Sequence, residues 1–171
     1  SNVLNGSGNL FTATQTNAVQ TFVATETATQ AQEQMEEILN LAVDFYKELK
    51  IHFRVLYEDA SKLTASETLR AVIQVYSPAE QRYVCVSRIS NYGDYVSKRI
   101  LFAMQQKNQH HFLHMVGGPV LYTSRLLAAL IENGIDLTKC KLLGAFVPNA
   151  ATSTEDQVVK DNVKAFKELF K

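Results

Sequence analysis

The first third of the chain shows a β-favouring run and then apolar residues at helical spacing. The run AVQTFVAT at 18–25 predicts a strand. Thr27 and Gln30 have the spacing of a capping box, which predicts the start of a helix. Apolar residues then recur at helical intervals and extend this helix to about residue 49: Met35, Ile38, Leu39, Ala42, Phe45, Tyr46 and Leu49.

The middle of the chain predicts a series of strands. IHFRVLYE (51–58) alternates in polarity, and LRAVIQVYS (69–77) and RYVCVSRI (82–89) are rich in β-favouring residues. The segment PAEQ (78–81) joins the last two, so we expect an antiparallel hairpin. HHFLHMV (110–116) predicts a further strand.

The sequence Gly117-Gly118-Pro119 predicts that this strand stops and that a helix begins, with Pro119 at an early helical position. Residues at helical spacing follow, with Gly134 just past the end: Leu121, Arg125, Ala128, Ala129 and Glu132. KLLGAFVP (141–148) predicts a last strand, and 153–170 predicts a closing amphipathic helix.

The order of these elements indicates the fold class. Strands and helices do not alternate as they do in βαβ units, so we expect an α+β fold in which helices flank an antiparallel β-sheet. Residues 1–17 are rich in Ser, Thr, Asn and Gly and predict a loop or frayed edge. Residues 18–171 are expected to form the folded core.

Composition narrows the function classes. The 171 residues carry no net formal charge, which argues against a domain that grips a nucleic-acid backbone across its whole surface. Cys85 and Cys140 lack the paired spacing of a disulfide framework or a zinc site. No apolar run approaches the roughly 20 residues that a membrane span needs.

Three histidines are the obvious candidates for metal ligands. His110 and His114 would share one face of a strand, with His111 on the other. No Cys or carboxylate within two residues completes a ligand set, so we interpret them as polar strand residues.

Four segments in this order carry a resemblance to a known family. They are LKIHFRV, VIQVYSP, CVSRISNYGDYVSKR and HMVGGP, the last leading to Arg125, Glu132 and Asn133. Together they resemble the catalytic core of seryl-tRNA synthetases, which are class II aminoacyl-tRNA synthetases. The resemblance covers the chain from about Leu10 onward and implies an incomplete class II core, the C-terminal part, without motif 1 or the N-terminal tRNA-binding arm. It also implies a strand over GDYVSKRILF (93–102).

The same resemblance implies a degenerate site. The family's motif 2 arginine, which meets the α-phosphate of ATP, aligns near Thr12, and its stacking aromatic aligns with Thr16. The following lysine and glutamate align with Ala18 and Gln20. No Lys or Arg precedes Lys47, so no small shift of the alignment restores the cation.

The magnesium position is altered as well. The family's magnesium-binding glutamate aligns with Cys85 and a neighbouring serine with Arg88. A thiol is a poor ligand for magnesium, and a guanidinium at about 4 Å would repel a divalent cation by several kcal/mol. Gly117 and Pro119 replace an asparagine and a hydroxyl residue of the serine pocket.

Arg125 matches the motif 3 arginine, which meets the γ-phosphate in the family. Asp94, Arg99 and Glu132 are also retained, and we interpret all four as a structural ion-pair set, with Arg125 a vestige of the nucleotide site. The resemblance therefore implies a pseudoenzyme with no catalytic residue, no bound metal and no cofactor.

The pattern is most similar to a non-catalytic branch of the family in insect mitochondria. This implies a mitochondrial matrix location, tRNA binding through a region outside this chain, and a heterodimer with the mitochondrial seryl-tRNA synthetase. Two alternatives stay open: an active ATP-dependent seryl-tRNA ligase with a rewired site, and a class II-derived accessory subunit of another mitochondrial complex, such as the DNA polymerase.

Overall fold

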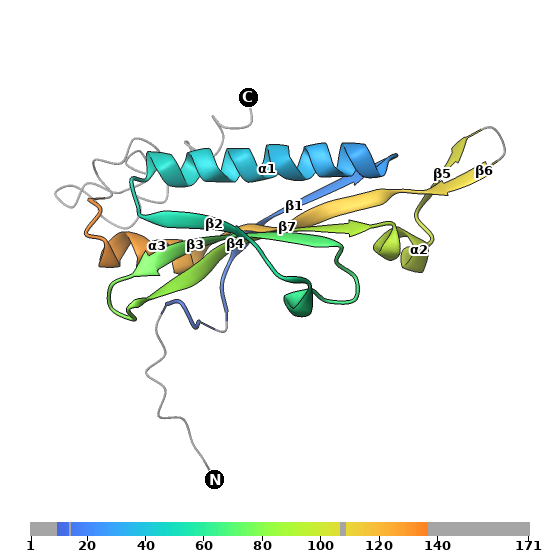
Figure 1. The fold of residues 1–171 in the computed structure, drawn as a ribbon. Helices are drawn as coiled ribbons and strands as arrows, with labels where there is room; N and C mark the ends of the chain where they lie inside the picture. Colours follow the sequence, from blue (N-terminus) through green and yellow to red (C-terminus); the bar gives the residue numbers. More distant parts are fainter. Residues whose placement is uncertain (1–9, 14, 107–108, 137–171) are drawn as a thin grey trace, which may run out of the picture. The chain divides into compact units, whose positions relative to one another are not determined.

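The computed structural model describes residues 10–13, 15–106 and 109–136, and its main feature is a five-stranded sheet in the order β1-β7-β4-β3-β2. Every neighbouring pair is antiparallel, which confirms the expected fold class (Figure 1). The strands are β1 (Ala18–Thr25), β2 (Phe53–Tyr57), β3 (Leu69–Ser77), β4 (Arg82–Gly93) and β7 (His114–Tyr122).

Helix α1 (Ala28–Glu48) lies along one face of this sheet, as Figure 1 shows. The predicted capping box is confirmed: the Thr27 hydroxyl accepts from the Gln30 N–H at 3.2 Å, and the Gln30 side chain accepts from the Thr27 N–H at 3.3 Å. The apolar stripe turns inward, and its buried members are Ala31, Met35, Ile38, Leu39, Ala42 and Tyr46. The Tyr46 hydroxyl donates to the Val86 carbonyl at 3.3 Å, so the helix is also tied to β4 by a polar contact.

Helix α3 (Thr123–Glu132) follows β7 and packs on β3 and β7. The Ser77 hydroxyl donates to the Glu132 carboxylate at 2.6 Å, which joins the end of β3 to the end of this helix. The smaller elements are η1 (Ala60–Lys62), α2 (Tyr95–Ile100), and a hairpin of β5 (Ala103–Gln106) and β6 (Gln109–Phe112).

The expected strand over 93–102 is wrong, because β4 ends at Gly93 and α2 follows. Gly93 has a φ of 53°, a left-handed conformation that favours glycine, and its N–H donates to the Asn91 side chain at 2.9 Å. Asp94 then pairs with Lys98 at 2.6 Å, and the Ser97 hydroxyl donates to the Asp94 carbonyl. These local contacts form a turn and one short helix.

The predicted break at Gly117-Gly118-Pro119 is also wrong, since β7 runs through it. A Cβ on Gly117 would lie 2.5 Å from the Thr21 carbonyl oxygen, and one on Gly118 would lie 2.4 Å from that of Arg88. The two glycines therefore serve the close packing of strands. The pairing of β7 with β4 does not extend beyond Gly117. Pro119 has no backbone N–H, and at this position its absence costs no hydrogen bond between β7 and β4.

The described residues before β1 form turns and bends, with Phe11 buried. The expected strand at 141–148 and helix at 153–170 lie outside the described residues. No helix in the described part of the chain is long and apolar enough to cross a membrane.

Candidate functional site

The sheet has one face covered by α1 and one face turned away from it. The rings of Tyr46 on α1 and Phe53 on β2 lie 6.1 Å apart, so Phe53 and its partner Val75 face the helix. Side chains alternate along a strand, which places the next pair, Arg54 and Gln74, on the opposite side. We call this side the open face.

A row of four residues crosses the open face. Phe22 on β1 pairs with Gly117 on β7, Gly117 with Ser90 on β4, and Ser90 with Arg70 on β3. Arg88 lies two residues from Ser90 on β4, opposite Val72, and Cys85 lies opposite Gln74 beyond a bulge. The register thus brings Cys85, Arg88 and Gly117 together on one face.

Two further expected site residues, Thr12 and Gln20, lie before and within β1. Gln20 is exposed and pairs with Pro119, two residues from Phe22 and on the same face. Thr12 is exposed in the bend before β1, and the sheet register does not place it among the others.

Cys85 is half-buried, and its thiol donates to the Ser87 carbonyl at 3.3 Å. Burial raises the pKa of this thiol; the charges of Arg88 and Arg125 act in the opposite direction and do not overcome it. The thiol is therefore neutral at pH 7. A neutral thiol beside the exposed Arg88 does not fit magnesium-bound ATP, because magnesium takes hard oxygen ligands.

Arg125 braces the sheet. Its guanidinium donates to the Cys85 carbonyl at 2.7 Å and lies 4.5 Å from the centre of the Tyr122 ring. The ion-pair set that the sequence suggested is not present in this form: Glu132 accepts from Ser77, Asp94 pairs with Lys98, and Arg99 lies over the Tyr95 ring.

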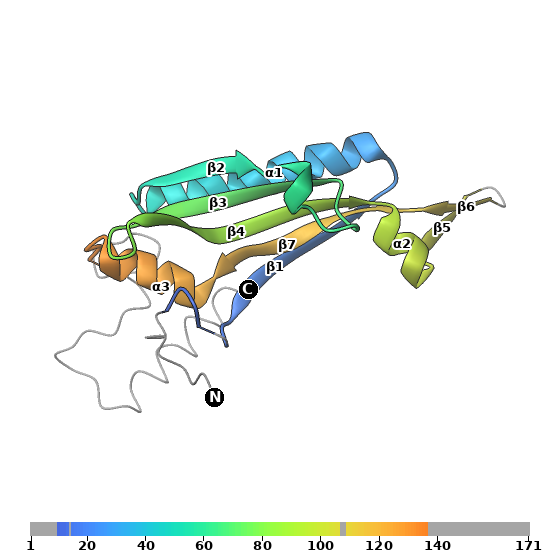
Figure 2. The ribbon, with the colours of Figure 1, turned by 60° about the horizontal axis from the view of Figure 1, so that its bottom comes forward.

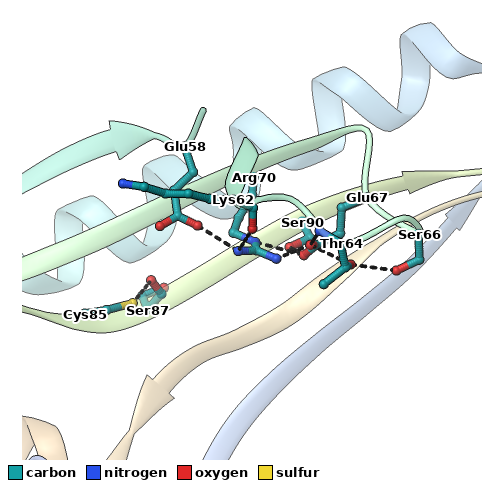
Figure 3. A network of polar contacts seen from close by, with 9 residues as sticks. All are labelled: Glu58, Lys62, Thr64, Ser66, Glu67, Arg70, Cys85, Ser87 and Ser90. Carbon is teal, nitrogen blue, oxygen red and sulfur yellow. Dashed lines mark hydrogen bonds and ion pairs between the residues drawn. The ribbon is translucent and has the colours of Figure 1, made fainter. Parts of the chain in front are cut away.

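A buried cluster around Arg70 is the polar feature of the open face that sequence reasoning missed (Figure 3). The Arg70 side chain is 7% exposed and contacts Glu58, which is 19% exposed, and Glu67, which is 5% exposed. A sequence signal that could have indicated it is an arginine within a β-rich run, three residues after a glutamate.

Glu67 is ionised within this cluster. Burial pushes the pKa of its carboxyl upward, but hydrogen bonds from Arg70, Ser90 and Thr64 outweigh burial and lower the pKa from 4.5 to about 2. The hydrogen bond to Glu67 in turn raises the pKa of Arg70. The two groups thus form a charge-assisted pair at neutral pH.

The three histidines lie beside a cavity of about 470 Å³, which Glu26 and Asp94 also line. His110 and His111 belong to β6 and His114 to β7. In the part of the chain that the structure describes, no three His, Cys, Asp or Glu side chains gather closely enough to hold a metal ion.

Comparison with known proteins identifies the fold family. Residues 14–134 match the family "tRNA synthetase class II core domain (G, H, P, S and T)". The chain belongs to this family. Two solved class II synthetases share the fold: the seryl-tRNA synthetase of Pyrococcus horikoshii, complexed with ATP, and the cytoplasmic serine-tRNA ligase of Naegleria fowleri, in complex with AMP. The first has a TM-score of 0.70 and 22% sequence identity, and the match covers 78% of this chain and 30% of that chain. The second has a TM-score of 0.68 and 23% sequence identity, and the match covers 73% of this chain and 30% of that chain.

Two sequence relatives belong to the seryl branch of the class II synthetases. The "Serine--tRNA synthetase-like protein Slimp" of Drosophila melanogaster is 58% identical over 94% of this chain and 33% of its own length. The serine--tRNA ligase of Chloroherpeton thalassium is 37% identical over 66% of this chain and 26% of its own length. These findings confirm the resemblance, while the chain spans only about a third or less of its curated relatives.

Proposed function

We propose that this chain is the core of a non-catalytic seryl-tRNA synthetase paralogue of the mitochondrial matrix. In this proposal the protein binds tRNA through a region outside this chain and forms a heterodimer with the catalytic mitochondrial seryl-tRNA synthetase. It carries out no aminoacylation.

The observation that carries the proposal is the neutral Cys85 thiol beside Arg88 on the open face. Activation of an amino acid on the α-phosphate of ATP depends on positioning and on neutralising phosphate charge, which class II synthetases achieve with arginines and magnesium. Cys85 and Arg88 cannot bind magnesium, and Gln20 and Thr12 offer no cation. Arg88 and Arg125 together supply two positive charges, which are too few for a triphosphate without magnesium.

The relatives support the same proposal. Identity to the Drosophila protein, whose name calls it synthetase-like, is 58%, against 37% to the bacterial ligase. The heterodimer is supported by a physical argument: class II cores pair through large interfaces, and a subunit without catalysis still buries its half of one. Matrix location and tRNA binding rest on the resemblance.

Serine-dependent ATP–pyrophosphate exchange by the complete protein tests the loss of catalysis. The catalytic mitochondrial seryl-tRNA synthetase, assayed at the same concentration, is the positive control. We expect exchange at the level of a no-enzyme blank. Exchange that rises with serine concentration would instead establish the active ligase.

Purification from mitochondria tests the partners. We expect the catalytic seryl-tRNA synthetase to co-purify in equal amount, with tRNA retained after washing at moderate salt. Recovery with subunits of another mitochondrial complex, and without the synthetase, would favour the accessory-subunit alternative.

A further inference from the structure

Residues 58–68 connect β2 to β3, and we call them the strap. The strap includes η1 and lies on the open side of the sheet, opposite α1 (Figures 1 and 2). Its two ends are fastened by backbone hydrogen bonds. The Glu58 N–H donates to the Arg70 carbonyl at 2.9 Å, and the Thr68 N–H donates to the Asn91 carbonyl at 2.8 Å. The strap is thereby anchored to both β3 and β4.

The middle of the strap is held by one guanidinium. Arg70 Nη1 donates to the Glu58 carboxylate at 2.8 Å and to the Lys62 carbonyl at 3.1 Å. Its Nε donates to one oxygen of Glu67 at 2.9 Å, and Nη2 donates to the other. A single side chain from β3 therefore contacts three residues of the strap with the forked geometry that suits carboxylates (Figure 3).

Glu67 joins this arginine to a second strand. Its Oε1 accepts from the Ser90 hydroxyl on β4 at 2.6 Å. Its Oε2 accepts from both the N–H and the hydroxyl of Thr64, at 2.9 and 2.8 Å. Strap, β3 and β4 thus share one network in which the buried charges are paired and hydrogen-bonded.

Burial shows which part of the open face the strap covers. Val72 and Ser90 are each 1% exposed, although both face away from α1. Phe22, in the same row as Ser90, is 65% exposed, and Arg88 is exposed. The strap and its cluster therefore cover Arg70, Val72 and Ser90, and they leave Arg88 on β4 and Phe22 on β1 uncovered.

We propose that the strap is a built-in cover latched by Arg70, whose guanidinium supplies from within the chain the cation that Glu58 and Glu67 would otherwise take from solution. Its consequence rests on the proposed function: the part of the face around Arg70, Val72 and Ser90, next to where a nucleotide would lie, is closed by the chain itself. The latch removes two carboxylates and a serine hydroxyl from any role toward a ligand.

Trypsin cleavage after Lys62, within the strap, tests the latch in the complete protein. Arg70→Met removes the guanidinium at similar length, and Arg54→Met is the matched control, because Arg54 lies on the same face and donates to Gln74 at 2.9 Å. Cleavage of a native protein follows the population of the locally open state. We expect Arg70→Met to be cleaved after Lys62 at least about tenfold faster than wild type, because breaking a buried ion pair is strongly destabilising, and Arg54→Met to match wild type.

Two further variants keep the test decisive. If α1 in Arg70→Met is no longer protected from hydrogen exchange, that variant is globally unfolded and Glu58→Gln is used in its place. We expect Glu58→Gln to be cleaved after Lys62 a few fold faster than wild type. In Arg70→Ala, millimolar methylguanidinium should restore slow cleavage, whereas equal sodium chloride should not. Equal cleavage of Arg70→Met and Arg54→Met, or no effect of methylguanidinium, would overturn the latch. No nucleotide enters this assay, so its failure is separate from that of the proposed function.

Discussion

The ionised Glu67 carboxylate makes stability depend on pH in a window set by its two pKa values. The pKa is lowered from 4.5 to about 2 on folding. Because one pKa unit is worth about 1.4 kcal/mol, the carboxylate contributes about 3 kcal/mol to the free energy of unfolding. For a depressed carboxyl pKa, this contribution is complete above pH 4.5 and is lost as pH falls through 2.

The substitution Glu67→Gln tests this figure. We expect urea unfolding to show the variant about 3 kcal/mol less stable than wild type at pH 6, with the difference falling to about 1 kcal/mol at pH 3. Glu36→Gln, at an exposed position on α1, is the control and should change stability by less than about 0.5 kcal/mol. A difference between wild type and Glu67→Gln that stays constant from pH 6 to pH 3 would show that the Glu67 charge does not stabilise the fold.

Three further substitutions test the fold and the role of Arg125. Thr27→Ala should lower the free energy of unfolding by about 1 kcal/mol through loss of the α1 cap, and an unchanged urea midpoint would contradict this. Gly117→Ala should destabilise by about 2 kcal/mol or more, because its Cβ would lie 2.5 Å from the Thr21 carbonyl; a wild-type Tm would show that β1 and β7 can separate. Arg125→Met should cost about 2 kcal/mol through the lost hydrogen bond to the Cys85 carbonyl and leave pyrophosphate exchange at background; undiminished stability would exclude a bracing role.

Local pattern was sufficient for much of the fold. The strand at 18–25 was predicted from its β-favouring residues, although its partner β7 is distant in sequence. The helix cap at Thr27 and the hairpin of β3 and β4 follow from contacts close in sequence, and all three were predicted at or near their observed bounds. The predicted strand break at Gly117-Gly118 was wrong because these glycines are needed for tertiary packing. They let the backbone of Thr21 and of Arg88 approach closely, and a local sequence pattern does not contain this information. At 93–102 the family resemblance suggested a strand, and the turn at Gly93 opposed it.

The candidate site was predictable in part for a similar reason. Cys85, Arg88 and Gly117 belong to motifs of the resembled family, so their convergence on one face could be anticipated from the resemblance. Strict alternation along β4 would have separated Cys85 from Arg88, and the bulge between them places both on the same face. The Arg70 cluster could not be, because its members come from the strap, β3 and β4 and meet only after the strap folds over the sheet.

Calorimetric titration of the complete protein with a non-hydrolysable seryl-adenylate analogue shows whether the serine and nucleotide sites are lost, because the analogue joins serine and nucleotide and needs no turnover. We expect no saturable binding at millimolar analogue, while the catalytic seryl-tRNA synthetase binds the analogue tightly under the same conditions. Saturable binding, with the analogue ordered beside Cys85 and Arg88 in crystals, would show that the site still binds an adenylate and would overturn the proposed loss of catalysis.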